Sequence, residues 1–195
     1  MTTSEIPDVG LTPVVAWSQR VRKVGGFIQL AFAVFWLVRG ANSVGGGVGT
    51  SLGFAALVAG AAALAYAVVS TRGIGGRPTS KPAKRIERSV TAATIIELVG
   101  SVVLPIVVIA TGHSDWVLPS IAITIGPLLL WLGHLVDIPR YRPIGWILTV
   151  GPVLLVAGLS GTALEATTGL SAGILLLATS TAGFRDLSNL RRVRT

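Results

Sequence analysis

One carboxylic acid lies in the middle of a strongly apolar stretch, and it is the residue of this chain best placed to do chemistry. Residues 89–111 read SVTAATIIELVGSVVLPIVVIAT, which is long enough to cross a bilayer, and Glu97 is their only ionisable side chain. An acid at the centre of a membrane helix costs at least ~2.5 kcal/mol unless it is paired, hydrated or neutral. Loss of hydration favours the neutral acid, which donates one hydrogen bond and accepts others. Glu97 therefore suits a proton relay, a cation site or a general acid.

A structural role for Glu97 is the alternative, with its carboxyl bonded to Gln29 or to a Ser or Thr on a neighbouring helix. Gln29 is the only strongly polar residue within the apolar stretch 24–38. A polar side chain at membrane depth needs a partner inside the bundle or in a bound molecule. We therefore predict that Gln29 is a binding residue.

His134 is the second candidate for proton handling. It lies near the inner end of the apolar stretch 116–136, with Trp131 about one turn deeper and Asp137 directly after the stretch. The depths of Glu97 and His134 differ by about 9 Å, so a water molecule or kinks at prolines would have to join them in a Glu–water–His relay. The simpler alternative places His134 among lipid headgroups beside Asp137. Trp131 and Asp137 join Gln29 as candidate binding residues.

Other patterns that could carry chemistry are incomplete. The chain has no Cys, which excludes disulfides and thiolate ligands. His113, Asp115 and Glu165 belong to loops on the same side of the membrane, but their spacing matches no metal-binding pattern. Residues 158–161 read GLSG, a rhomboid-protease-like motif, yet no His follows to act as its base. We expect neither a metal nor a cofactor.

The composition is that of an integral membrane protein. Hydrophobic residues make up 51% of the 195 residues and charged residues 12%, and the mean hydropathy is +0.75. Soluble domains carry about 25% charged residues. The sequence predicts an all-α, polytopic fold with six transmembrane helices in one domain, residues 24–184, between an N-terminal tail, 1–23, and a basic C-terminal tail, 185–195. The six predicted spans are 24–38, 51–69, 89–111, 116–136, 144–159 and 167–184.

The positive charges alternate along the predicted spans. Of sixteen Lys and Arg residues, fifteen fall in four groups, and only Arg39 falls on the opposite side; the groups are residues 20–23, 72–88, 140–142 and 185–194. This positive-inside pattern predicts a bacterial inner-membrane protein with both termini in the cytoplasm. The net charge of +8 then favours contacts with membrane lipids and excludes a nucleic-acid partner, because no aromatic platform accompanies the charges.

Glycine and proline predict local features of the bundle. Gly53, Ala56, Gly60 and Ala63 recur at helical spacing and allow close backbone approach, which predicts that the second span packs at the bundle centre; a helix that lines a substrate path is the alternative. Residues 40–50 are rich in Gly and are expected to form a flexible or tightly turned outer loop. The fourth and fifth spans share a Gly-Pro pair, which predicts two kinks near mid-membrane.

The segment WVLPSIAITIGPLLLWLGHLVDIPRYRPIGWILTVG, residues 116–151, resembles a family of small bacterial six-helix membrane proteins of unknown function. In that family a helix ends in Gly-x-His-Phe-x-Pro-Leu-Ala, and a basic turn and a Tyr-rich helix follow. Gly133, His134 and Arg140 fit this pattern, whereas Asp137 stands where the family has Pro. The resemblance covers about a fifth of the chain. It implies the six-helix fold and draws attention to His134 without implying an activity.

Three functions are consistent with these observations. A small carrier or proton-coupled transporter for a lipophilic or ionic ligand needs a hydrated route to Glu97. A membrane enzyme that acts on a lipophilic substrate, in the manner of an isoprenoid cyclase, needs an enclosed apolar cavity with Glu97 at its wall and an aromatic residue such as Trp131 nearby. A non-catalytic accessory subunit, in a homo-oligomer or a larger membrane complex, predicts no cavity and leaves Glu97 on an exposed helix face.

Overall fold

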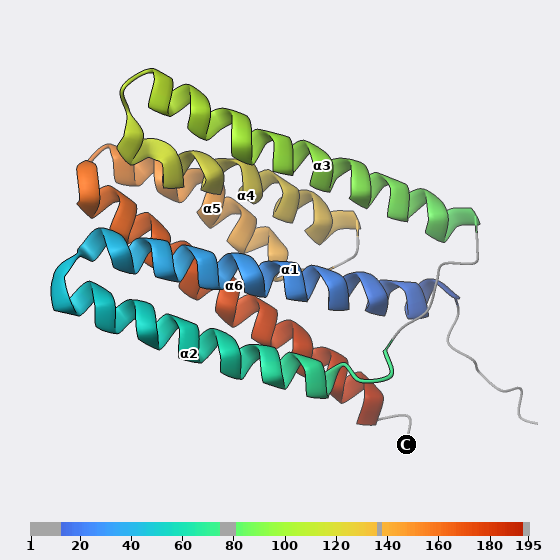
Figure 1. Cartoon of the computed structure of the whole chain (residues 1–195). Coiled ribbons are helices and arrows are strands. Elements are labelled where there is room, and N and C mark those ends of the chain that lie inside the picture. Colours follow the sequence, from blue (N-terminus) through green and yellow to red (C-terminus); the bar gives the residue numbers. More distant parts are fainter. Residues whose placement is uncertain (1–12, 75–80, 136–137, 193–195) are drawn as a thin grey trace, which may run out of the picture.

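The computed structural model describes residues 13–74, 81–135 and 138–192, and these ranges contain helices and no strands (Figure 1). The predicted all-α fold is confirmed. The elements are α1 (Pro13–Val44), α2 (Gly46–Ser70), α3 (Lys81–Ala110), the short 3₁₀ helix η1 (Ser114–Trp116), α4 (Val117–Leu135), α5 (Tyr141–Val156) and α6 (Gly161–Arg192).

Five of the described helices are long and apolar enough to cross a membrane, namely α1, α2, α3, α4 together with η1, and α6. Helix α5 is apolar but has only 16 residues. At 1.5 Å per residue it is roughly 24 Å long, which is shorter than the hydrocarbon core of a typical bilayer, about 30 Å. The length and composition of the helices are therefore those of a polytopic membrane protein.

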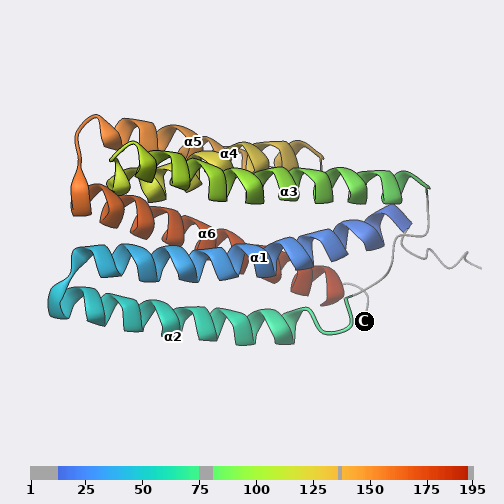
Figure 2. The ribbon, with the colours of Figure 1, turned by 45° about the horizontal axis from the view of Figure 1, so that its top comes forward.

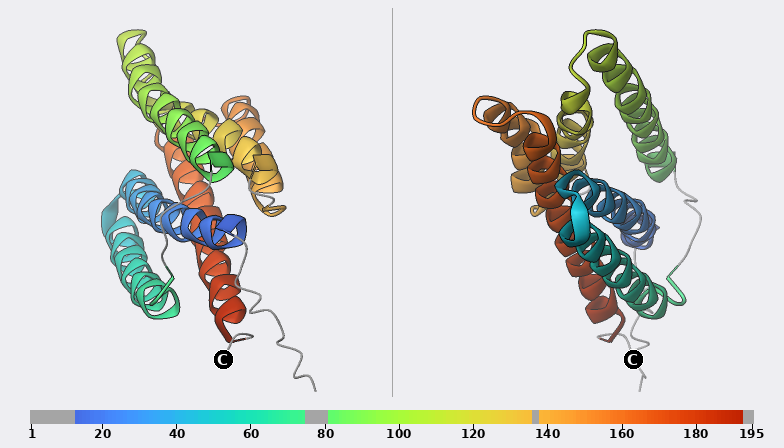
Figure 3. Two further views of the ribbon diagram at one scale, coloured as in Figure 1. Left: turned by 90° about the vertical axis from the view of Figure 1, so that its right-hand side faces the viewer. Right: turned by 60° about the vertical axis from the view of Figure 1, so that its left-hand side comes forward.

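The helices run back and forth along one axis, so that their ends gather at two ends of the bundle (Figure 1). Helices α1 and α6 cross in the middle, α5 packs against α4, and α2 and α3 occupy opposite edges (Figures 1 and 3). The start of α1, the end of α2, the start of α3 and the end of α6 share one end of the bundle. Because basic residues flank these termini, one end of the bundle is strongly positive.

The glycine-rich stretch 40–50 contains the tight turn that was one of the two expectations, but the stretch is helical over most of its length, so the prediction that all of it forms an outer loop was wrong. Helix α1 continues through Gly40 to Val44, and α2 begins at Gly46. The chain reverses at Gly45, whose φ of 74° lies in the left-handed region that glycine adopts readily. Gly40 instead serves helix packing, because it lies against the backbone of α6.

The crossing of α1 and α6 depends on backbone contact between two glycines. A Cβ atom added to Gly169 would lie 2.6 Å from the Cα atom of Gly40, and one added to Gly40 would lie 2.6 Å from the backbone nitrogen of Leu170. Larger residues at either position would push the helices apart. The buried core around the crossing comprises Ala33, Trp36, Leu118, Ala122, Ile125, Leu129, Ala172 and Leu176.

Substituting Gly169→Ala is expected to destabilise the bundle by about 1–3 kcal/mol, because the added methyl group meets backbone atoms that cannot move separately. Gly47→Ala is the matched control: Gly47 is also helical, and a Cβ atom there meets nothing within 4 Å. The midpoint of thermal unfolding in detergent should fall for Gly169→Ala and stay level or rise slightly for Gly47→Ala. Equal midpoints for the two variants would contradict the close crossing.

The small residues of α2 face α1, so the predicted close packing is confirmed. The predicted place of this helix at the bundle centre was wrong, because α2 lies at an edge and contacts mainly α1. Gly49, Gly53, Ala56 and Gly60 are buried on one side of the helix. A Cβ atom on Gly60 would collide with the side chain of Val34 on α1. The opposite side of α2 carries exposed apolar side chains, which suit a lipid environment.

Helices α4 and α5 approach each other closely through the two glycines Gly126 and Gly145. A Cβ atom on Gly145 would lie 2.7 Å from the carbonyl oxygen of Gly126. Both helices continue through their prolines, Pro127 and Pro152. Helix α4 therefore packs closely against α5 on one side, and α3 packs against α4 as well.

Candidate functional site

A cavity of about 240 Å³ lies among α1, α3 and α4, in the half of the bundle nearer its positive end. A cavity of ~150 Å³ is large enough for benzene. This cavity therefore has room for a ligand somewhat larger than one aromatic ring. Its walls are formed by Arg20, Val24, Gly25, Ile28, Gln29, Phe32, Val90, Thr91, Thr94, Glu97, Ile125, Leu128, Leu129, Leu132, Ile138, Tyr141 and Leu176.

Most of the cavity wall is aliphatic, and a few polar groups interrupt it. Helix α4 contributes Ile125, Leu128, Leu129 and Leu132, whereas Glu97, Thr91 and Thr94 come from α3 and Arg20 and Gln29 from α1. Apolar walls with a few convergent polar groups are typical of binding sites for small organic molecules. The wall favours a ligand with an apolar body and at least one polar group.

Glu97 is half-buried at this wall, as the sequence prediction of an interior acid requires. Within the described residues, no hydrogen bond or ion pair joins its carboxyl group to another side chain. The bond to Gln29 that a structural role would need is not formed. The Glu97 carboxyl group is therefore available to a bound molecule.

The position of Glu97 follows from how α3 is held. One turn further along α3, the hydroxyl groups of Ser101 and Thr124 are 2.9 Å apart and share a hydrogen bond that ties α3 to α4. Gly100 allows this approach, because a Cβ atom there would lie 3.2 Å from the Thr124 methyl group. Only 11% of the apolar part of α3 is buried, so this contact with α4 largely determines which way Glu97 faces.

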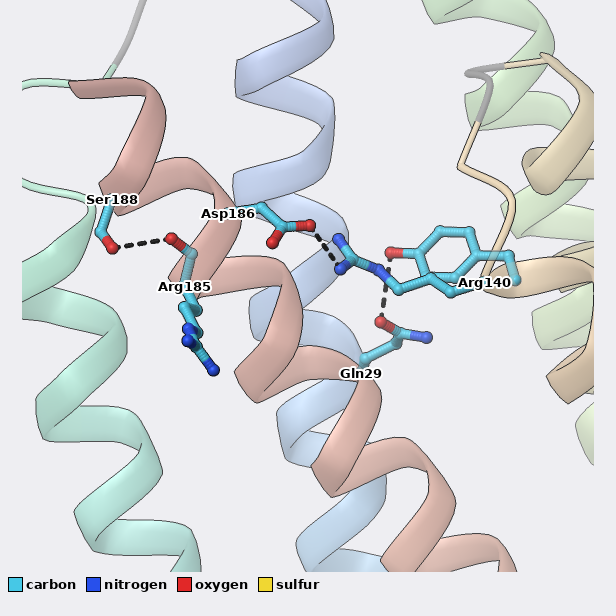
Figure 4. A network of polar contacts seen from close by, with 6 residues as sticks. Gln29, Arg140, Arg185, Asp186 and Ser188 are labelled. Atoms are coloured by element: carbon cyan, nitrogen blue, oxygen red, sulfur yellow. Dashed lines mark hydrogen bonds and ion pairs between the residues drawn. The ribbon is translucent and has the colours of Figure 1, made fainter. Parts of the chain in front are cut away.

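Gln29 lies in the same cavity and is only 7% exposed. Its Oε1 atom accepts a hydrogen bond of 3.2 Å from the Tyr141 hydroxyl group (Figure 4). Its Nε2 atom is buried and has no hydrogen-bond partner in the part of the chain that the structure describes. A buried amide donor without a hydrogen-bond partner destabilises a protein by about 1–3 kcal/mol. A hydrogen bond from Nε2 to an acceptor on a bound molecule would remove this cost.

Tyr141 is a cavity residue that the sequence did not single out. It is the first residue of α5, and it is buried. The preceding residue, Arg140, donates a 2.6 Å hydrogen bond within its ion pair with Asp186 on α6, and this pair anchors the start of α5 (Figure 4). The only signal in the sequence was an aromatic residue next to a basic turn, which is common at membrane interfaces.

The cavity opens sideways between α1 and α3. Val24 and Ile28 of α1 line the cavity and are also 49% and 45% exposed, and Thr91 of α3 is exposed opposite them. We call these three residues the mouth. Figure 2 shows that the start of α1 approaches the start of α3 at the positive end of the bundle. In a membrane, a mouth on this side of the bundle faces lipid.

His134 and Trp131 lie outside the cavity wall. His134 is exposed, and its Nδ1 atom is 2.8 Å from the carbonyl oxygen of Leu130 on its own helix. Trp131 is 37% exposed and faces outward. Asp137 lies outside the described residues. The structure thus brings together Glu97 and Gln29 of the predicted set, and it places His134 and Trp131 elsewhere.

The variant His134→Ala is expected to leave ligand binding and its pH dependence unchanged, because the imidazole does not reach the cavity that contains Glu97. The measurement is the dissociation constant of a cavity ligand for the wild type and the variant over a range of pH. A change in the pH profile would restore the Glu–water–His relay as a hypothesis.

The polar residues at the other end of the bundle have structural roles. Asp115 accepts a 2.9 Å hydrogen bond from the backbone nitrogen of Gly161, which ties η1 to the start of α6. Glu165 accepts a 2.7 Å hydrogen bond from Ser43, which ties α6 to α1. Over residues 13–74, 81–135 and 138–192, no three His, Asp or Glu residues come close enough together to hold a metal ion.

No protein-family model, curated protein or solved structure shows a significant match to this chain. The resemblance of residues 116–151 to the family of small bacterial membrane proteins stays a prediction. The cavity and its polar groups are the features of this chain that point to a function.

Proposed function

We propose that the chain crosses the bacterial inner membrane six times, with both termini and the positive end of the bundle in the cytoplasm. The grouping of basic residues at the ends of α1, α2, α3 and α6 supports this orientation, since Arg39 alone lies near the opposite end. In this arrangement α5 is a sixth, shorter span packed against α4. The cavity then lies in the cytoplasmic half of the membrane.

Within that membrane domain, the protein is a small carrier for a lipophilic amine. The observation that carries this proposal is the Glu97 carboxyl group, which has no partner among the described residues and lies at the wall of an apolar cavity. A carboxylate binds an ammonium group through a charge-assisted hydrogen bond, which is about twice as strong as a neutral one. The aliphatic wall removes the apolar body of the same ligand from water.

The same carboxyl group links binding to protons. Glu97 can hold either a proton or the ammonium group of the ligand, because both need the same oxygen atoms. Release of the ligand on one side of the membrane is then accompanied by uptake of a proton, and the reverse exchange restores the starting state. One positive charge replaces another at Glu97, so the site never carries an uncompensated charge in the membrane.

The mouth between α1 and α3 suits a ligand that dissolves in lipid. Val24 and Ile28 would lie in the hydrocarbon region, so a lipophilic amine could reach the cavity without leaving the membrane. An enzyme of the cyclase type is less favoured, because it needs an enclosed cavity and this one opens sideways, even though Phe32 and Tyr141 supply aromatic groups to the wall. A purely accessory role predicts no cavity beside Glu97.

The experiment compares two ligands of nearly equal shape, phenethylamine and phenethyl alcohol, on the wild-type protein in lipid nanodiscs. Empty nanodiscs provide the correction for partition into lipid. We expect the amine to bind at least ~10-fold more tightly, which corresponds to about 1.4 kcal/mol. Equal affinities, or binding no greater than in empty nanodiscs, would overturn the proposed function.

A further inference from the structure

A second polar group in the cavity narrows the class of ligand. We propose that Gln29, held in one orientation by Tyr141, recognises a hydrogen-bond acceptor on the ligand, so that the ligand is an amine that also carries a hydroxyl, ether or carbonyl oxygen. This inference rests on the proposed function, because it takes the amine group to be bound at Glu97. It adds a specificity determinant that charge alone does not supply.

The hydrogen bond from Tyr141 sets the orientation of the Gln29 side-chain amide. An amide group presents an oxygen that accepts and a nitrogen that donates, and the two ends look alike in shape. The hydroxyl hydrogen of Tyr141 is donated to Oε1 of Gln29 at 3.2 Å. With that end occupied, the donating Nε2 end is the one left for another molecule. Both side chains are buried, so water in the bulk solvent does not compete for either group.

The Nε2 atom of Gln29 lacks an acceptor within the described part of the protein. No acceptor among the described residues reaches it, although it is shielded from solvent. Gln29 lines the cavity from α1, and Glu97 lines it from α3. A ligand that fills the space between these helices can present its ammonium group to one side and an oxygen atom to the other. A ligand without the oxygen leaves the amide donor unpaired.

The test uses phenethylamine and phenylethanolamine, which differ by one hydroxyl group. The preference for the hydroxylated amine is the dissociation constant of phenethylamine divided by that of phenylethanolamine, both measured in nanodiscs. We expect Gln29→Met, which has a similar shape and no donor, to reduce the wild-type preference for the hydroxylated amine by about 3- to 10-fold. Because the hydroxyl group changes partition into lipid equally for every variant, the ratio of preferences isolates the contact with Gln29.

Tyr141→Phe tests whether Tyr141 positions the amide. Loss of the phenol hydroxyl group frees Oε1 and allows the amide to turn, so the preference should fall although Gln29 is still present. Tyr66→Phe is the matched control, because Tyr66 is the only other tyrosine and it lies exposed on α2. In the Gln29→Met background, Tyr141→Phe should cause no further change in preference.

The outcomes separate this inference from the proposed function. If Gln29→Met keeps the wild-type preference, Gln29 does not recognise the ligand and the inference fails. If the wild type distinguishes phenethylamine from phenethyl alcohol but shows no preference that Gln29→Met or Tyr141→Phe alters, only the inference fails. If Gln29→Met does not fold, the comparison of Tyr141→Phe with Tyr66→Phe decides the question alone. If the wild type binds neither amine, the proposed function fails first.

Discussion

Replacing Glu97 by Gln should reduce the affinity for phenethylamine by about 10- to 100-fold, the value of one charge-assisted hydrogen bond of ~1.5–3 kcal/mol. Glutamine keeps the shape of the side chain but cannot carry the negative charge that balances an ammonium group. The affinity for phenethyl alcohol should change much less, because a neutral ligand does not need that charge. The measurement is the dissociation constant of each ligand in nanodiscs.

Glu165→Gln is the matched control for this substitution. Glu165 also lies on a long apolar helix, α6, but it accepts a hydrogen bond from Ser43 and does not line the cavity. Its loss should lower stability slightly and leave the affinity for the amine unchanged. A fall in affinity of the same size in both variants would mean that the loss of a carboxyl group acts through folding, and would contradict a specific role for Glu97.

The pH dependence of amine binding is an independent test of the role of the Glu97 carboxyl group. In the wild type, protons compete with the ammonium group for the Glu97 carboxylate, so the affinity for the amine should fall as the pH is lowered. The comparison is made below the pH at which the amine loses its own proton, so that the charge of the ligand stays constant. Glu97→Gln should show a flat profile over that range. A flat profile in the wild type would contradict proton coupling.

Narrowing the mouth should slow the uptake of ligand. Ile28→Trp places an indole ring where a side chain both lines the cavity and faces outward. The indole ring is expected to raise the free-energy barrier to ligand entry by about 1–3 kcal/mol. This increase corresponds to a fall of roughly 5- to 100-fold in the rate of uptake. The measurement is the initial rate at which proteoliposomes with an acidic interior take up radiolabelled phenethylamine in exchange for protons, minus the uptake by protein-free liposomes.

Phe35→Trp is the control for added bulk on the same helix. Phe35 is 48% exposed, similar to Ile28, but it is not part of the cavity wall. Uptake by Phe35→Trp should equal that of the wild type. If Ile28→Trp transports at the wild-type rate, the ligand does not pass between α1 and α3, and a route from the aqueous side near Arg20 would have to be considered instead.

The helical class of the fold follows from composition and local pattern. Long apolar stretches with few charges must satisfy their backbone hydrogen bonds internally, and an α-helix does this within one segment. The same local reasoning located Glu97 and Gln29, since a polar residue in an apolar stretch is visible without knowledge of its neighbours. It also located the small residues of α2 that pack against α1.

Local pattern could not show which residues meet. Gln29 and Tyr141 are 112 positions apart, and their hydrogen bond exists because α1 and the start of α5 come together at the positive end of the bundle. His134 and Trp131 lie in the same apolar stretch as cavity residues such as Leu128 and Leu132, but they point outward. The direction of a side chain around a helix depends on which faces of that helix its neighbours cover.

The amino-acid sequence alone determined the helical content, the long apolar segments and the isolated acid, because each depends on the chemistry of a short segment. The tertiary structure decided that Gly40 packs against Gly169 instead of loosening a loop, and that Glu97 shares a cavity with Gln29. Both outcomes depend on contacts between segments far apart in the chain. In a chain whose helices are apolar on nearly every side, such contacts depend on shape and hydrogen bonding more than on hydrophobic pattern.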